Sequence, residues 1–246
     1  MSKILICCDF DGTLTHRVGS KTEISPFYQS LFDIQQDKFM LKPSEEVQTL
    51  FVEKFGEYTP EFNYKGIKDS DILMSSQAVT FLKELLKSEQ VAINIITKNR
   101  KEYVEALLTY QGFTKEDIAK ITIKDSGDKY KDVKERIKEM KPIQGLIFAY
   151  VFDDNKDDMC KMYNALYGKH FEIKTYSKSP RQFKWLEYLK EIMGKISSEE
   201  CLTNEVREKI ISDTGLRGDP SPSFFPTLNV TRKVELDNQE KKDLSL

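Results

Sequence analysis

The stretch Ile4-Leu5-Ile6-Cys7-Cys8-Asp9-Phe10-Asp11-Gly12-Thr13 decides the fold. Its first five residues are apolar and run into a polar loop, which predicts a buried strand. Asp9 and Asp11 come directly after that strand, so we expect both carboxylates at its carboxyl end, where open α/β sheets bind their ligands. Two neighbouring carboxylates repel each other, and a divalent cation commonly compensates them. Gly12 allows the backbone to turn tightly and to approach a phosphate.

Outward from this stretch, apolar runs alternate with helical patterns. Further strands are predicted at residues 91–96, 146–152 and 171–176. Helices are predicted at residues 72–86, 103–112, 130–140 and 159–167, and from an N-cap at Ser179-Pro180 through Met193. This alternation predicts an α/β fold, in which a Rossmann-like parallel sheet is covered by helices on both faces.

Polar residues follow the other two strands at the same expected edge of the sheet. Thr97, Lys98 and Asn99 follow the second strand, and an acidic cluster at 153–158 follows the third. Each signal has an ordinary alternative, since a threonine before a helix is often an N-cap and an acidic loop is often simply solvated. A lysine at the start of the preceding helix, Lys129 or Lys131, would return a cation to this edge. Together these groups predict a binding crevice.

Composition and charge exclude several classes of protein. The chain has 246 residues, with 38 basic and 40 acidic side chains and a net charge of -2. It therefore has no net positive charge that would attract a nucleic acid. A membrane span needs about 20 apolar residues, and we expect no transmembrane helix because the longest apolar run is 146–152. The four cysteines form no CxxC pair, and the apolar run at the amino terminus is too short for an export signal. Both features suit a cytoplasmic protein.

Two segments fall outside the alternation of strands and helices. Residues 16–70, called the insert below, have helix starts at Ser25-Pro26 and Ser44 and contain nine aromatic residues. These aromatic side chains form either a small core of the insert itself or part of a ligand site. Residues 198–246 contain a short helical pattern and a proline-containing, polar end, which predicts a flexible tail or a segment that docks a partner. The expected core is therefore 1–15 with 71–197.

With these groups at one edge of the sheet, the sequence resembles the haloacid dehalogenase (HAD) superfamily of aspartate-nucleophile phosphatases. The resemblance covers about residues 3–190 and rests on four motifs in the family's order. The first motif is matched by Asp9 and Asp11, the second by Thr97, the third by Lys129 or Lys131, and the fourth by Asp153, Asp154 and Asp158. Lys129 is preferred for the third motif because it lies 25 residues before Asp154, a separation similar to that in relatives.

The resemblance implies a role for each matched residue. Asp9 would attack phosphorus and form an aspartyl-phosphate, and Asp11 would act as general acid and then general base. Thr97 and Lys129 would neutralise oxygens of the transferring phosphoryl group. Gly12, Thr13, Lys98 and Asn99 are expected beside the substrate, and Asp153 and Asp158 in supporting positions.

The resemblance also implies a cofactor and a cap. Mg²⁺ would be held by the Asp9 carboxylate, the Asp11 backbone carbonyl and the Asp154 carboxylate. The insert occupies the place of the family's C1 cap, here expected to be mainly helical, while the interval from Thr97 to Lys129 is too short for a second cap. Such a cap could close over a small metabolite or leave the crevice open to a phosphoprotein, and aromatic residues would suit phosphotyrosine.

The polar tail is similar to the carboxyl-terminal signals of bacterial effectors delivered into a host cell, some of which are HAD-like phosphotyrosine phosphatases. The alternatives are a small-metabolite phosphatase, a phosphomutase, and a catalytically idle module that binds phosphate and recruits partners. Cys201 and Arg207 have the Cys-x5-Arg spacing of another phosphatase class, but no glycine or preceding strand supports that reading. Arg217-Gly218-Asp219 is read as a turn, and His16 as a candidate substrate contact.

Overall fold

A computed structural model describes residues 4–17, 25–35, 38–60, 66–140, 148–168 and 172–197. Met1–Ile196 form one compact unit that includes the insert. The tail at 198–246, with Cys201, Arg207 and Arg217-Gly218-Asp219, lies outside the described residues, so its helix and docking role stay predictions, as do the proposed domain boundaries. Within the described residues, no helix is long and apolar enough to cross a membrane.

The described part of the chain contains a five-stranded parallel sheet in the order β5-β4-β1-β6-β7. Its strands are β1 (Ile4–Cys8), β4 (Val91–Ile96), β5 (Ile121–Lys124), β6 (Phe148–Phe152) and β7 (Glu172–Tyr176). In chain order, β4 and β5 are added on one side of β1, and β6 and β7 are then added on the other side. The order therefore reverses beside β1, which is where parallel α/β sheets form a ligand crevice.

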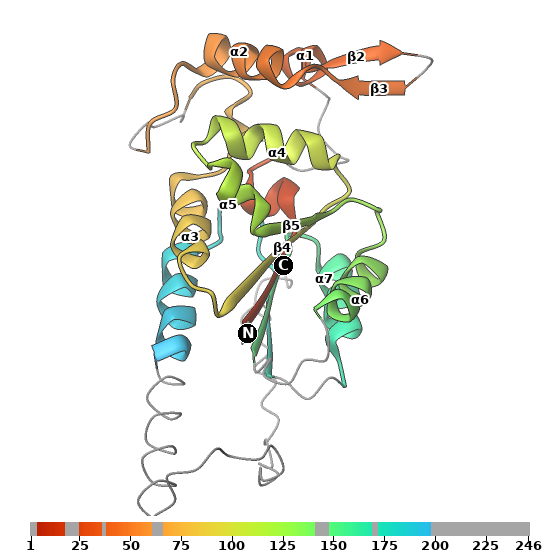
Figure 1. Ribbon diagram of the computed structural model, residues 1–246, viewed down its shortest axis with the longest axis vertical. Helices are drawn as coiled ribbons and strands as arrows, with labels where there is room; N and C mark the ends of the chain where they lie inside the picture. Colours follow the sequence, from red (N-terminus) through yellow and green to blue (C-terminus); the bar gives the residue numbers. More distant parts are fainter. Residues whose placement is uncertain are drawn as a thin grey trace, which may run out of the picture. The chain divides into compact units, whose positions relative to one another are not determined.

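Helices cover both faces of the sheet, as the alternation predicts (Figure 1). Along β1, Ile4, Ile6 and Cys8 are buried in one apolar core, and Leu5 and Cys7 are buried in the other. The first core is covered by α3 (Ser76–Leu86), α4 (Lys101–Tyr110) and a helix at 185–197, and the second by α6 (Lys129–Glu139) and α7 (Lys156–Leu166). β1 is therefore buried on both faces, which explains its unbroken apolar run.

Some predicted elements are placed differently in the structure. Strand β5 and the short helix α5 (Lys115–Ala119) were not expected. The predicted helix start at Ser179-Pro180 is wrong, because those residues begin a turn closed by the Gln182 N–H bonded to the Ser179 carbonyl at 3.0 Å. Proline suits the second position of such a turn, and Arg181 follows with a φ of 71°. The helix itself spans 185–197.

The insert combines helices with a hairpin. It contains α1 (Pro26–Ser30), β2 (Phe32–Gln35), β3 (Lys38–Leu41) and α2 (Ser44–Phe55). The Ser25 side chain caps α1 by accepting the Tyr28 N–H, and Gly56 ends α2 with a φ of 81°. Both helix starts agree with the sequence, whereas the antiparallel pair β2–β3 was not expected.

Among the described residues, three aromatic side chains of the insert pack against α4 and do not form a separate core. Phe27, Phe51 and Phe55 surround one another, and Phe51 stacks on Tyr110 of α4 with ring centroids 4.9 Å apart. The Tyr110 hydroxyl also donates to the Gly56 carbonyl at 2.9 Å. The insert is thus held on α4 by buried rings that belong to the main apolar core.

Candidate active site

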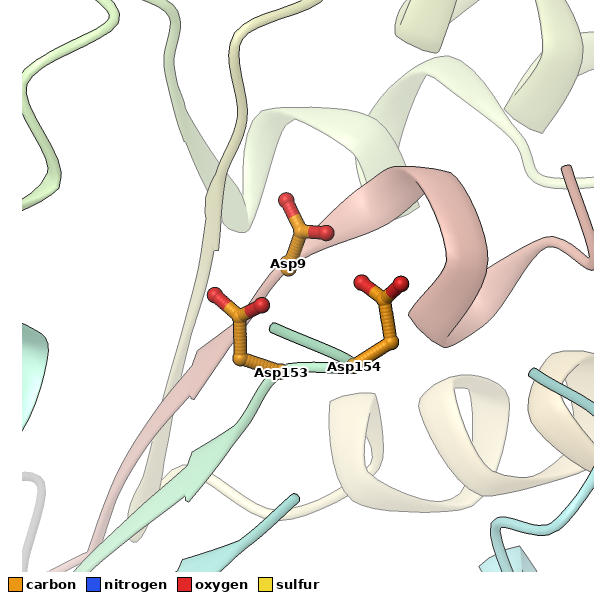
Figure 2. Close-up of side chains that lie close together, drawn as sticks. All are labelled: Asp9, Asp153 and Asp154. Carbon is orange, nitrogen blue, oxygen red and sulfur yellow. The ribbon is translucent and has the colours of Figure 1, made fainter. Parts of the chain in front are cut away.

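The carboxyl ends of β1 and β6 place three carboxylates together. Asp9 follows β1, and its N–H donates to the carbonyl of Phe152, the last residue of β6, at 2.9 Å. Asp153 and Asp154 follow β6 directly. One carboxylate oxygen from each of the three aspartates lies within 4.8 Å of those of the other two, and Figure 2 shows the three side chains close together beside the strand ends. The strand ends therefore bring together the first and fourth predicted motifs.

Lys129, in the first turn of α6, is the cation of this cluster. Its Nζ lies 2.7 Å from Asp9 Oδ1 and 2.7 Å from Asp153 Oδ2, and its side chain is only 3% exposed. The side chain of Lys131 is 62% exposed and pairs with Glu135 of its own helix. The structure thus places Lys129, and not Lys131, against Asp9.

Asp154 is positioned by the turn that contains Gly12 and Thr13. The Asp154 N–H donates to Thr13 Oγ1 at 2.9 Å, and Gly12 has a φ of 79°. A Cβ atom on Gly12 would lie 2.5 Å from Asp154 Oδ2, well inside van der Waals contact. The glycine is therefore needed for its left-handed backbone and because Asp154 fills the space beside it.

The negative charge of the cluster exceeds what Lys129 neutralises. Burial raises the pKa of Asp9 well above its usual value despite the nearby lysine, and burial also raises the pKa of Asp153 and Asp154. Burial lowers the pKa of Lys129, but Asp9 and Asp153 outweigh this effect and raise it. A second cation would relieve the remaining repulsion.

Two of these carboxylates suit a divalent cation better than the third. Asp153 already uses both oxygens, since Oδ2 faces Lys129 and Oδ1 accepts the Asn155 N–H at 2.8 Å. Asp9 and Asp154, two of the predicted metal ligands, offer the hard oxygen donors that such ions prefer. The donor set therefore fits a divalent cation, with Asp153 in a supporting position between the lysine and α7.

Asp11 lies on the α4 side of the crevice. Its Oδ2 accepts from Asn99 Nδ2 at 3.0 Å, while its Oδ1 is buried with no hydrogen-bond partner among the described residues. Burial raises the pKa of Asp11, although Arg17 and the Asn99 hydrogen bond oppose the shift. Thr97, at the end of β4, is buried and accepts the Asn99 N–H at 2.9 Å.

Asp158 orients two predicted site residues. It lies in the first turn of α7, and its Oδ2 is 2.6 Å from Lys98 and 3.9 Å from Lys129. Lys161 pairs with the other oxygen at 2.6 Å. Burial would raise the pKa of Asp158, but hydrogen bonds from Lys161 and Lys98 outweigh it and lower the pKa. Asp158 is therefore a charged support for the lysines.

A cavity of about 260 Å³ adjoins the cluster at Thr13. It is lined by Thr13, His16, Ser75, Ser76, Gln77, Arg181, Phe183 and Trp185. His16, a candidate substrate contact, is thus beside the site, and burial together with the nearby Arg181 lowers its pKa. The cavity offers one cationic group, several hydroxyl or amide groups and two aromatic rings.

Two residues near Asp11, Arg17 and Tyr28, are not among the site residues predicted from the sequence. Arg17 is buried and lies over the ring of Tyr28, with its guanidinium carbon 3.8 Å from the ring centroid. The Tyr28 hydroxyl donates to Asn99 Oδ1 at 3.1 Å. No local pattern marks either residue, because their contacts join distant segments, such as Tyr28 and Asn99, which are 71 positions apart.

Comparisons with known proteins point to one group. Neither a family model nor a curated protein matches the chain. Two solved structures of the Legionella pneumophila effector Ceg4 do match: one, with an N-terminal yeast Hog1p sequence, is 39% identical over 79% of this chain and 95% of that chain, with a TM-score of 0.71. The other, with an N-terminal protease cleavage sequence, is 40% identical over 79% and 94%, with a TM-score of 0.72.

The HAD domain of Lem4, another L. pneumophila effector, is also similar. It is 26% identical over 78% of this chain and 95% of that domain, with a TM-score of 0.59. Together with the parallel sheet and the order of the motifs, these similarities show that the chain belongs to the HAD-like effector family that includes Ceg4 and the HAD domain of Lem4.

Proposed function

We propose that the chain is a Mg²⁺-dependent phosphomonoester hydrolase that works through an aspartyl-phosphate on Asp9. One observation carries this proposal: Asp9 and Asp154 lie in a cluster with Asp153, and Lys129 lies 2.7 Å from Asp9. A nucleophilic carboxylate, a divalent-cation site and a fixed positive charge are the groups that phosphoryl transfer requires. Mg²⁺ bound by Asp9 and Asp154 would neutralise charge on the phosphoryl oxygens.

The proposed reaction has two steps. An Asp9 oxygen forms a bond to phosphorus while the ester P–O bond breaks, and the departing oxygen takes the proton of Asp11. Asp11, now a carboxylate, accepts a proton from water as that water attacks the phosphorus, and the Asp9–phosphorus bond breaks to release phosphate. Lys129 and Thr97 hold the phosphoryl oxygens during both steps.

The raised pKa of Asp11 supports its proposed role as the acid. A general acid must hold its proton when substrate binds, and burial favours the protonated form of this carboxyl group. Burial raises the pKa of Asp9 as well, and Lys129 opposes that shift. The proposed role of Asp9 as the nucleophile therefore rests on its position beside Lys129 and Asp154, and not on its pKa.

The proposed substrate is phosphotyrosine in a host protein. Two features support it: the identity with an effector, a class of protein delivered into host cells, and the cavity beside Thr13, whose Arg181, Phe183 and Trp185 suit acidic and apolar side chains next to the phosphorylated residue. The buried rings of the insert give no support, because Phe27, Phe51 and Phe55 are packed among themselves and against α4.

The first experiment measures phosphate release from p-nitrophenyl phosphate with and without Mg²⁺. Wild type and Asp157→Asn, a change at an exposed aspartate in the first turn of α7, should both hydrolyse the ester. Asp9→Asn keeps the shape of the side chain but removes its nucleophilic charge and should reduce the rate by at least about 10³-fold. Folded wild-type protein that binds Mg²⁺ and releases no phosphate would favour the idle binding module.

Matched peptides then test the substrate class. Three peptides of one sequence that carry phosphotyrosine, phosphoserine or phosphothreonine at the same position should differ in kcat/KM. The value should be highest for the phosphotyrosine peptide. A preference for sugar phosphates over all three peptides would reject the protein substrate and favour a metabolite phosphatase. Transfer of phosphate to a sugar, without release of inorganic phosphate, would identify a phosphomutase.

A further inference from the structure

The insert reaches the centre of the site through a chain of two hydrogen bonds. Tyr28, on α1 of the insert, donates its hydroxyl to Asn99 Oδ1 at 3.1 Å, and Asn99 Nδ2 donates to Asp11 Oδ2 at 3.0 Å. Three separate segments therefore meet here: the insert, the loop after β4 and the turn after β1.

The orientation of the Asn99 amide depends on Tyr28. Asn99 Oδ1 accepts from the Tyr28 hydroxyl and from the Arg100 N–H, the latter at 2.8 Å. If the amide were flipped, its NH₂ group would face these two donors and both hydrogen bonds would be lost. The amide is thereby held with its NH₂ group toward Asp11.

This arrangement makes the two oxygens of Asp11 different. Oδ2 is held by Asn99, whereas Oδ1 is buried with no partner among the described residues. A carboxyl group held at one oxygen keeps its plane and rotamer, so the other oxygen is free to hold a proton and to meet a leaving group. Burial without a partner is costly, and such a group commonly marks a functional position.

Tyr28 is itself firmly placed. Its ring contacts the rings of Tyr103 and Phe32, each with centroids 5.1 Å away, and the Arg17 guanidinium lies over its ring at 3.8 Å. Cation–π and aromatic contacts fix the ring plane and therefore the direction of the hydroxyl. More packing is present than a surface tyrosine needs to stay ordered.

We propose that Tyr28 is a positioning residue for Asp11, which it holds through Asn99 in the geometry needed to protonate the leaving oxygen. This inference rests on the proposed phosphatase activity, and it makes the insert a part of the reaction centre as well as a cover. Its consequence is specific. Loss of the Tyr28 hydroxyl should slow the release of strongly basic leaving groups, which need a proton, and should spare weakly basic ones, which do not.

The test compares phenyl phosphate with p-nitrophenyl phosphate in wild type, Tyr28→Phe and Asp11→Asn. The two esters have similar size, but phenoxide is the more basic leaving group. For Tyr28→Phe we expect kcat/KM to fall about tenfold with phenyl phosphate and less than about twofold with p-nitrophenyl phosphate. This quantity reports the step that releases the leaving group, whereas kcat also contains the hydrolysis of the aspartyl-phosphate, in which Asp11 acts as the base with either ester. Tyr167→Phe, at an exposed tyrosine directly after α7, is the matched control and should behave as wild type.

A double mutant tests whether Tyr28 acts through Asn99. In the Asn99→Ala background, Tyr28→Phe should have no further effect on the ratio of the two rates, because the connection is already broken. Equal losses with both esters would show that Tyr28 only supports packing, and an unchanged ratio in Tyr28→Phe would also overturn the proposal. Wild type that hydrolyses neither ester would reject the proposed function and, with it, this inference.

Discussion

Lys129 holds two carboxylates of the site. Its replacement should lower both activity and stability, whereas replacement of its neighbour Lys131 should change neither. We expect Lys129→Ala to lower kcat by about 10²–10³-fold, since a fixed positive charge at the phosphoryl group is lost. It should also destabilise the fold by about 3 kcal/mol, because Asp9 and Asp153 stay buried without their cation. Lys131→Ala, at an exposed position, should keep both properties near wild type. Rate assays and urea denaturation measure the two effects, and equal behaviour of the variants would contradict this assignment.

Gly12 offers a second pair of matched variants. Gly12→Ala and Gly56→Ala each place a side chain at a positive φ, which costs on the order of 1–3 kcal/mol. Only at Gly12 would the added Cβ also collide with Asp154, because nothing lies within 4 Å of the corresponding position at Gly56. Gly12→Ala should therefore weaken Mg²⁺ binding at least about tenfold, whereas Gly56→Ala should not. Mg²⁺ titrations of activity compare them, and an unchanged metal requirement in Gly12→Ala would refute the steric argument.

The residues that could be predicted from sequence all follow a strand or start a helix. Asp9, Thr97 and Asp154 each follow an apolar run, and parallel strands bring their carboxyl ends to one edge. Tyr28 and Arg17 could not be predicted, because their contacts with Asn99 and Asp11 arise from packing between distant segments. Local patterns report which element a residue belongs to and say little about what that element packs against.

Strands that are unbroken apolar runs were predicted with accurate bounds. The bounds of helices were less exact, since the helix predicted at 72–86 begins at Ser76, and some short elements were missed. Strands β1 and β4 agree with the predicted ranges, since each is an unbroken apolar run. Strand β5 has four residues and only Ile121 and Ile123 are buried, which is too short an alternation to stand out. The same holds for the hairpin β2–β3. At Ser179-Pro180 the proline favours a turn as readily as a helix start, and only the surrounding structure decides between them.

The packing of α2 on α4 explains how the insert is held in place. Phe51 is fully buried and stacks on Tyr110, so Phe51→Ala should destabilise the protein by about 3–5 kcal/mol. Ile34→Ala, in the hairpin of the same insert, removes a side chain at a position that is 70% exposed and should change stability by less than about 0.5 kcal/mol. Urea denaturation followed by circular dichroism measures both. A small effect at Phe51 would show that the insert does not depend on this contact.

Considered as a whole, the metal-free molecule is expected to gain stability as the pH falls from neutral toward mildly acidic values. Burial raises the pKa of Asp9, Asp11, Asp153 and Asp154. In this window these four carboxyl groups bind more protons in the folded state than in the unfolded state, so acidification favours folding. His16, whose pKa is lowered, opposes this gain as a single group. The gain ends at the ordinary carboxyl range, where Asp158, whose pKa is lowered, begins to lose its ion pairs. Thermal melts across pH without metal check the direction, and a steady loss of stability on acidification would contradict it.

Mg²⁺ should reverse this pattern by replacing protons at the cluster. At neutral pH, saturating Mg²⁺ should raise the melting temperature, and the rise should shrink as the pH falls. Asp154→Asn should raise the metal-free melting temperature by about 2–4 °C, equivalent to about 1 kcal/mol, and should abolish the response to Mg²⁺. Asp157→Asn, at an exposed site in the first turn of α7, should respond as wild type. An Asp154→Asn protein that Mg²⁺ still stabilises fully would place the cation elsewhere.

The most direct test of the aspartyl-phosphate mechanism is to trap the phosphoryl group on the protein. Asp11→Asn can still transfer phosphate from p-nitrophenyl phosphate to Asp9, because that leaving group needs no proton, but it lacks the base for the second step. Acid quenching and peptide mass spectrometry should find phosphate on the peptide that contains Asp9, and none there in the Asp9→Asn, Asp11→Asn double variant. Turnover by wild type with phosphate found on another residue, or on none in Asp11→Asn, would contradict the mechanism.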